Sequence, residues 1–182
     1  MNEKDLISGC QKNDNVCRRY LYERYAGKMM GICFRYTGDT ASAEDILHDG
    51  FIRIFESIHS FQYRGEGSLR AWMSRIFVNL ALEFLRKNKN TESLPSEDWK
   101  ETESVSENDF EEIPLDILME FISELPPGYR TIFNLNTFED MQHKEIAKML
   151  DINESSSRSQ LSRAKAILAK KITNYIHAYG QR

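Results

Sequence analysis

The amino-acid sequence predicts an all-α protein of two small helical domains joined by an acidic, flexible linker. Apolar residues recur at steps of three and four along most of the 182 residues, as in helices that bury one face. No stretch sustains the apolar–polar alternation of a strand, and there are only 9 glycines and 4 prolines. Residues 91–113 interrupt the periodicity, so the predicted domains are residues 1–90 and 114–182.

Residues 1–90 are predicted to form three or four packed helices. The first long helix is expected to end at Gly38, and Thr40 or Ser42 is positioned to cap the next one. The glycine-containing segment 65–68 precedes the third. The expected buried faces of the three helices are Tyr22, Tyr25, Met29, Cys33 and Tyr36; then Leu47, Phe51, Ile54, Ile58 and Phe61; then Leu69, Met73, Ile76 and Leu80.

The segment 91–113 carries the acidic excess of the chain. The formal net charge of the protein is -4, yet this stretch alone has nine acidic residues and one lysine. The flanking segments 1–90 and 114–182 have net charges of +3 and +1. A segment with so few apolar residues cannot offset the entropy of ordering, and its like charges keep it extended. The negative total therefore does not exclude a nucleic-acid partner for the two domains.

Residues 114–182 are predicted to form four helices. The first covers residues 115–125 and ends at Pro126-Pro127-Gly128, and the second covers residues 129–138. A third spans residues 143–150, and the last follows a three-residue turn, with Asn153 or Ser155 as its cap. The expected buried face of the last helix is Leu161, Ala164, Leu168, Ile172 and Tyr175.

The last two of these helices have the layout of a helix-turn-helix. The small Ala147 lets a second helix cross closely, and Asp151 in the turn tolerates left-handed backbone geometry. Residues 158–182 contain six basic residues and no acidic one, which suits duplex DNA; an ordinary solvated helix face is the alternative. The side chains available to donate hydrogen bonds to base edges are Ser155, Ser156, Ser157, Arg158, Ser159, Gln160, Ser162 and Arg163.

Aromatic and basic residues are interleaved in residues 61–90. This combination suits single-stranded nucleic acid, because unpaired bases stack on rings while cations follow the backbone. The alternative is that the rings fill the core, which we expect for Phe77 and Phe84, whereas Tyr63 and the loop 65–67 are candidates for contact with bases. The full set comprises Phe61, Tyr63, Trp72, Phe77 and Phe84 with Arg64, Arg70, Arg75, Arg86, Lys87 and Lys89.

The helix predicted to begin near residue 40 is acidic. Asp45 and Asp49 share a face because they are four residues apart, and Arg53 is the only cation on this helix. Paired carboxylates also occur in catalysis and in metal sites, but no nucleophile, glycine loop or ligand cluster accompanies these. We expect a docking face for a basic protein.

Other features exclude several classes of protein. Three cysteines without C-x-x-C spacing predict small apolar residues on helices rather than disulfides. The polar N-terminus has no signal-peptide core, and no apolar run is long enough to span a membrane. The four histidines have no metal-ligand spacing. We expect a cytoplasmic, soluble protein without metal or cofactor.

Four segments in this order resemble the extracytoplasmic-function (ECF) sigma factors of the sigma-70 family. The segment 43–55, AEDILHDGFIRIF, is similar to the helix that grips the clamp of core RNA polymerase. The segment 69–87, LRAWMSRIFVNLALEFLRK, is similar to the helix that opens and recognises the -10 element. The segment 125–130, LPPGYR, and the helix-turn-helix resemble the domain that recognises the -35 element.

This resemblance implies a promoter-specificity subunit that is not itself an enzyme. It implies core-polymerase contacts at Asp45, His48, Asp49, Phe51 and Ile52. It implies -10 contacts at Tyr63, Arg64, Arg70, Trp72, Arg75, Asn79, Arg86 and Lys87, with capture of a flipped base by the loop 63–68. It implies -35 contacts at Ser155, Ser156, Arg158, Ser159, Ser162 and Arg163.

The resemblance further implies an anti-sigma factor as a partner and a path for the acidic linker through a basic polymerase channel. A stand-alone helix-turn-helix regulator of duplex DNA is the alternative function. That alternative accounts for residues 140–172 but leaves the pattern in residues 43–87 and the linker without a role.

Overall fold

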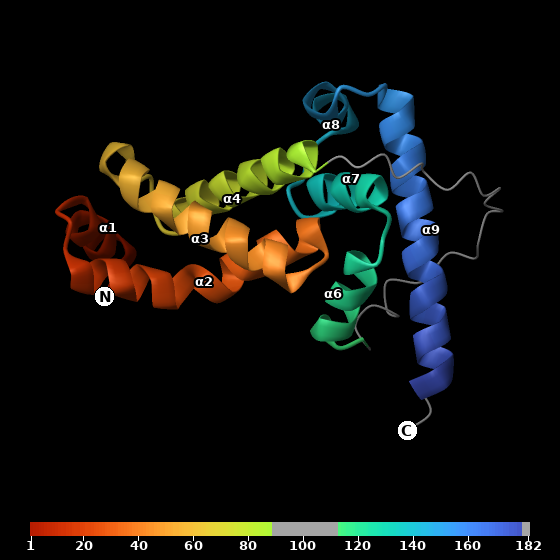
Figure 1. Ribbon diagram of the computed structural model, residues 1–182, viewed down its shortest axis with the longest axis horizontal. Coiled ribbons are helices and arrows are strands. Elements are labelled where there is room, and N and C mark those ends of the chain that lie inside the picture. The colour runs from red at the N-terminus through yellow and green to blue at the C-terminus, as the bar shows by residue number, and fades with distance from the viewer. Residues whose placement is uncertain (89–112, 180–182) are drawn as a thin grey trace. The chain divides into compact units, whose positions relative to one another are not determined.

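The structure is a computed structural model that describes residues 1–88 and 113–179, and all regular secondary structure in these residues is helical (Figure 1). The prediction of an all-α protein is confirmed. The acidic linker lies outside the described residues except for Ile113. The helices are α1 (Glu3–Gln11), α2 (Asn15–Thr37), α3 (Thr40–Ser57), the 3-10 turn η1 (Ile58–Ser60), α4 (Ser68–Lys87), α6 (Leu115–Ser123), α7 (Pro127–Thr137), α8 (His143–Leu150) and α9 (Glu154–Tyr179).

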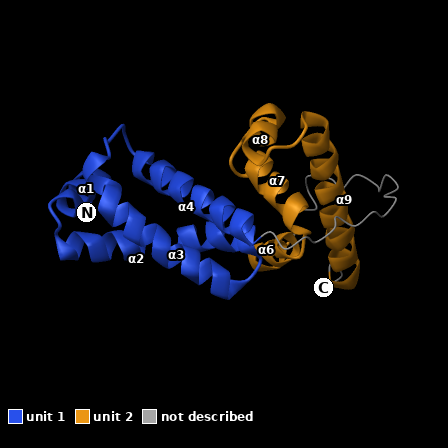
Figure 2. Ribbon diagram, turned by 45° about the horizontal axis from the view of Figure 1, so that its top comes forward, with its two compact units in different colours: residues 1–90 blue, residues 91–182 orange. Residues whose placement is uncertain are grey.

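The chain divides into two compact units, residues 1–90 and 91–182 (Figure 2). In the first unit, α2, α3 and α4 pack against one another, and α1 packs against α2. The predicted helical faces supply most of this core. Tyr22 differs, being 44% exposed, because its ring lies at the edge of the α2–α3 contact, 4.6 Å from that of Phe51. The buried set includes Tyr25, Met29, Cys33, Tyr36, Phe51, Ile54, Ile58, Leu69, Met73 and Leu80.

Aspartates, rather than hydroxyl residues, cap two helices of the first unit, α2 and α3. Asp39 accepts a hydrogen bond from the backbone amide of Ser42 at 2.8 Å, so the cap of α3 lies one residue before the predicted Thr40. Asp14 caps α2 by accepting from the amide of Val16 at 2.7 Å. The carboxylates also meet the positive ends of the helix dipoles, which adds to the stabilisation.

Gly50 allows α3 and α4 to approach closely, and replacing it with alanine is expected to destabilise the first unit. A Cβ atom at this position would lie 2.0 Å from Cε1 of Phe77, which is fully buried. We expect Gly50→Ala to lower the free energy of unfolding by about 1–3 kcal/mol through overpacking. Hydrogen exchange of the α3 and α4 amides measures this loss without reporting on the second unit.

Gly27→Ala is the matched control, because a Cβ at Gly27 on α2 meets no heavy atom within 4 Å. This change is expected to stabilise the helix by about 0.5–1 kcal/mol, as alanine restricts the unfolded chain more than glycine does. Equal protection in Gly50→Ala and the wild type would contradict the close contact with Phe77.

In the second unit, α7 and α8 pack against α9, and α6 also contacts α9. The turn between α8 and α9 contains Asp151 in the left-handed region, at φ 55° and ψ 51°, as the sequence predicts. Gln142 and Glu145 form a reciprocal capping box at the start of α8. The buried residues include Ile122, Leu125, Tyr129, Ile132, Leu135, Ile146, Leu161, Ala164, Leu168 and Ile172.

The three cysteines are free and buried, which confirms their predicted role as small apolar residues. Burial raises the pKa of Cys10 to about 11 and that of Cys33 to about 12, so both thiols stay protonated at neutral pH. Within residues 1–88 and 113–179, no helix meets the length and hydrophobicity of a membrane span. The same residues contain no cluster of metal-ligating side chains.

Candidate nucleic-acid and protein interfaces

Four of the five residues predicted to contact the polymerase share one exposed face of α3. Asp45, His48, Asp49 and Ile52 follow one another at steps of three, one and three, and all are exposed. Ile52 is 45% exposed, so this face combines two carboxylates with an apolar side chain. Arg53 pairs with Glu83 of α4 at 3.3 Å and not with either aspartate. We call Asp45, His48, Asp49 and Ile52 the acidic face.

Phe51 lies outside the acidic face, because its side chain points into the core. It is 4% exposed, and its ring centroid lies 4.6 Å from that of Tyr22 and 5.6 Å from that of Phe77. At about 100° per residue, Asp45, His48, Asp49 and Ile52 fall within one arc of α3, and Phe51 lies outside it on the side that packs on the core. Phe51 supports the acidic face from behind: its burial confirms its place on the expected buried face of this helix and corrects its implied place on the contact surface.

The loop between η1 and α4, residues 61–67, is shaped by its glycines and by Ser68; we call it the Gly65 loop. Gly65 and Gly67 have φ values of 115° and 85°, which other residues rarely adopt. The Ser68 hydroxyl donates to the carbonyl of Gly65 at 2.6 Å and accepts from the amide of Arg64 at 3.2 Å. Tyr63, which is 40% exposed, and Arg64 project from this loop.

Helix α4 presents four of its predicted contact residues within an arc of about 60°, at 3.6 residues per turn. These residues are Trp72, Arg75, Asn79 and Arg86. Arg75, Asn79 and Arg86 are exposed, and Trp72 is half-buried with its ring centroid 4.9 Å from that of Phe61. Arg70 and Lys87 are exposed but lie off this arc. Phe77 is fully buried, as the core alternative predicts, and Phe84 is half-buried.

The C-terminal end of α4 carries a three-residue charge network. Glu83 accepts from Lys87 at 3.1 Å and from Arg53 at 3.3 Å. The pKa of the Glu83 carboxyl is lowered, mainly by the hydrogen bond from Lys87. The positive charges of Lys87 and Arg53 lower it further. Lys87 thus forms an exposed ion pair with Glu83 in the free protein, while Arg86 beside it points to solvent.

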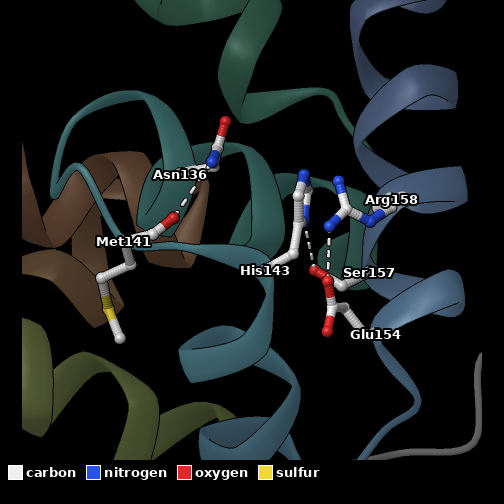
Figure 3. Close-up of polar contacts among 6 residues, drawn as sticks. All are labelled: Asn136, Met141, His143, Glu154, Ser157 and Arg158. Atoms are coloured by element: carbon white, nitrogen blue, oxygen red, sulfur yellow. Dashed lines mark hydrogen bonds and ion pairs between the residues drawn. The ribbon is translucent and has the colours of Figure 1, made fainter.

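A buried polar pair joins the two helices of the helix-turn-helix (Figure 3). His143 Nδ1 and Ser157 Oγ lie 2.9 Å apart, and Ser157 is fully buried. Asn136 also donates from Nδ2 to the carbonyl of Met141 at 3.0 Å, which ties the end of α7 to the approach to α8 (Figure 3). Ser157 therefore supports the packing of α9 and does not present its hydroxyl to solvent.

The residues predicted to contact the -35 duplex lie along the first turns of α9. Ser155, Arg158, Ser159 and Ser162 are exposed, and Ser156 is half-buried. Arg163 is exposed as well, although its guanidinium Nη1 lies within 3.3 Å of the Tyr129 hydroxyl. At about 100° per residue, the exposed members fall on one side of the helix.

Glu154 holds Arg158 in the free protein. The two side chains form an ion pair one turn apart at the start of α9 (Figure 3). Both are exposed, so this pair adds little stability and opens readily when a phosphate or base competes. The spacing of four residues between Glu154 and Arg158, which is visible in the sequence, is the signal that predicts this pair.

Two family models match the chain in the order of its units. The model described as Sigma-70 region 2 matches residues 21–91, and the model described as Sigma-70, region 4 matches residues 115–168. The first match covers α2 from residue 21 onward, α3 and α4; the second covers α6 to α8 and the first part of α9, including the turn between α8 and α9.

Two similar relatives align with this chain over nearly the whole length of both proteins. The chain is 27% identical to an ECF RNA polymerase sigma-E factor of Haemophilus influenzae, over 94% of this chain and 96% of the relative. It is 26% identical to the ECF RNA polymerase sigma factor SigW of Bacillus subtilis, over 93% of this chain and 96% of the relative. A solved structure of CnrH in complex with the cytosolic domain of CnrY covers 97% of this chain and 98% of the other, at 18% identity and a TM-score of 0.47.

Proposed function

We propose that the two units of this chain, which belongs to the ECF group of the sigma-70 family of RNA polymerase sigma factors, bind different parts of the transcription machinery. A sigma factor directs core RNA polymerase to promoters by recognising promoter DNA. In our proposal the first unit binds core polymerase and the -10 element, and the second binds the -35 element. Its first support is that the two matched sigma regions fall on different compact units.

The acidic face of α3 is the proposed contact with core polymerase. Its two carboxylates are exposed beside Ile52, and the nearby cation Arg53 is engaged with Glu83. Such a surface combines charge, which guides association, with an apolar side chain that gains from burial. We propose that Asp45, His48, Asp49 and Ile52 touch the polymerase, with Phe51 holding them in place.

The Gly65 loop and α4 are the proposed contact with melted -10 DNA. The exposed ring of Tyr63 offers a stacking surface for an unpaired base, and Arg75 and Arg86 lie along one side of α4, where they can follow the phosphates. Capture of unpaired bases stabilises the open strand without any chemical step, so this role requires neither a nucleophile nor a metal. Residues proposed for contact are Tyr63, Arg64, Arg70, Trp72, Arg75, Asn79, Arg86 and Lys87.

The exposed side of α9 is the proposed contact with the -35 duplex. Its N-terminal turns carry exposed arginine and serine donors that suit base edges and phosphates in the major groove. The observation that carries the whole proposal is that this helix-turn-helix follows the region 2 match in one chain. A stand-alone regulator of duplex DNA would leave the region 2 match without a role.

The proposal is tested by reconstitution with core RNA polymerase. Addition of the protein is expected to produce transcripts with a defined start on sheared DNA of the source genome, and the starts identify the promoters. Core enzyme alone is the control. Failure to bind core, or transcription that starts at random, would contradict the sigma function, whereas duplex binding without core binding would favour the stand-alone regulator.

We further propose that an anti-sigma protein covers the acidic face in the unstimulated cell and that the protein acts in the cytoplasm. An exposed apolar side chain beside two carboxylates supports the first point, because a basic protein can compete with the polymerase there. In the assembled enzyme, we propose that the acidic linker follows a basic channel of the polymerase. Its charge of nine acidic residues against one basic residue supports that path.

A further inference from the structure

One end of the Gly65 loop is held by a buried carboxylate from α1. Gly67 is the N-cap of α4 and has no side chain to satisfy the first amides of that helix. Glu3 supplies the cap: Oε2 accepts from the Gly67 amide and Oε1 from the Leu69 amide, both at 3.1 Å. The residue is only 6% exposed. A side chain 64 residues away thus sets where the loop ends and α4 begins.

The Glu3 carboxylate is itself oriented by its surroundings. Tyr25 of α2, which is 3% exposed, has a raised pKa: burial is the largest cause, and the charge of the Glu3 carboxylate raises it further. The Tyr25 phenol therefore stays protonated. A buried carboxylate is costly unless its oxygens are satisfied, and here two amides at a helix N-terminus satisfy them.

The other end of the Gly65 loop is held by the last residue of the same helix. Gln11 donates from Nε2 to the carbonyl of Ile58 at 3.1 Å and to that of Phe61 at 3.0 Å. Glu3 and Gln11 are the first and last residues of α1. Helix geometry separates them by a fixed rise of about 12 Å, at 1.5 Å per residue.

We propose that α1 is a rigid spacer that sets the shape of the Gly65 loop, with Glu3 and Gln11 as positioning residues for capture of an unpaired -10 base. The loop contains two glycines at positive φ, so its own backbone restricts it weakly and external anchors decide its conformation. A cleft of about 430 Å³ borders this arrangement, lined in part by Glu3, Arg24 and Tyr63. This inference rests on the proposed role of the first unit in -10 recognition.

The test uses holoenzyme on a promoter from which the wild type initiates, with 2-aminopurine placed at single positions of the non-template -10 strand. We expect Glu3→Gln and Gln11→Ala each to reduce the equilibrium constant for base capture about tenfold, the value of one hydrogen bond to a charged or buried group. Discrimination against promoters with a substituted -10 base is expected to fall in parallel. The affinities for core polymerase and for the -35 duplex are expected to stay within about twofold of the wild type. Substitutions at distant sites that share no contacts act independently of one another.

Two further variants sharpen the result. Asp5→Asn removes the same charge from an exposed position of α1 and is expected to leave base capture unchanged. Gln11→Glu keeps the shape of the side chain but replaces its donor with a carboxylate facing two carbonyl oxygens, so it is expected to lose more than Gln11→Ala.

Unchanged fluorescence and unchanged -10 discrimination in both Glu3→Gln and Gln11→Ala would overturn the spacer role. An equal loss of core affinity would also overturn it, because that result indicates general destabilisation of the first unit. Failure of the wild-type holoenzyme to initiate would count instead against the sigma function. The two proposals are therefore separable in one experiment.

Discussion

Replacing Asp49 with arginine is expected to weaken binding to core RNA polymerase by about 2–4 kcal/mol, the range for loss of a charge contact at an interface. Asp49 is exposed on α3 between His48 and Ile52, and the pairing of Arg53 with Glu83 leaves the charge of this face negative. An arginine here would repel a basic partner surface as well as remove the attraction. Competition with a labelled sigma factor for core polymerase measures the loss.

Glu44→Arg is the matched control for this prediction. Glu44 is exposed on the same helix and undergoes the same change of charge, but it lies at the edge of the acidic face, about 40° from His48 and about 140° from Asp49 around the helix axis. We expect it to retain core binding apart from a weaker dependence on salt. Equal losses in the two variants would show that net charge, and not the acidic face, governs the interaction. Binding of the -35 duplex should stay intact in both.

Replacing Arg158 with alanine is expected to weaken binding to the -35 duplex by about 1–3 kcal/mol, the value of a bidentate contact to a base. Arg158 is exposed in the first turns of α9, and only the exposed ion pair with Glu154 holds it in the free protein. Breaking that pair costs little, so the guanidinium is available to DNA. Anisotropy titrations of labelled duplex at several salt concentrations measure both affinity and salt slope.

Three variants make the Arg158 result specific. Lys170→Ala removes an exposed cation about 18 Å further along α9, at 1.5 Å per residue, and is expected to leave -35 discrimination unchanged. Arg163→Ala is expected to act in the same direction as Arg158→Ala, since Arg163 is exposed on the adjoining turn. Glu154→Gln is expected to tighten binding, because it removes the competitor for Arg158. If Arg158→Ala and Arg163→Ala both leave the affinity for the -35 duplex and its salt dependence unchanged, the DNA contact does not lie on this side of α9.

The helices of both units were predictable because their determinants are local. Apolar spacing and the breaks at Gly38 and Pro126 are visible within a few residues of each helix end. The left-handed turn residue Asp151 follows from the same kind of local preference. The cap of α3 was misplaced by one residue, since Asp39, Thr40 and Ser42 are all good caps and the backbone path decides among them.

By itself, the sequence determined the all-α class, the helix-turn-helix and the resemblance to sigma factors, because side-chain periodicity and motif order lie along the chain. Only the tertiary structure decided which side chains reach a surface. It placed the ring of Phe51 against that of Phe77, and it brought Glu3 to the amides of Gly67 and Leu69. Those contacts join residues 26 to 66 positions apart in the sequence, where local pattern carries no information about distance.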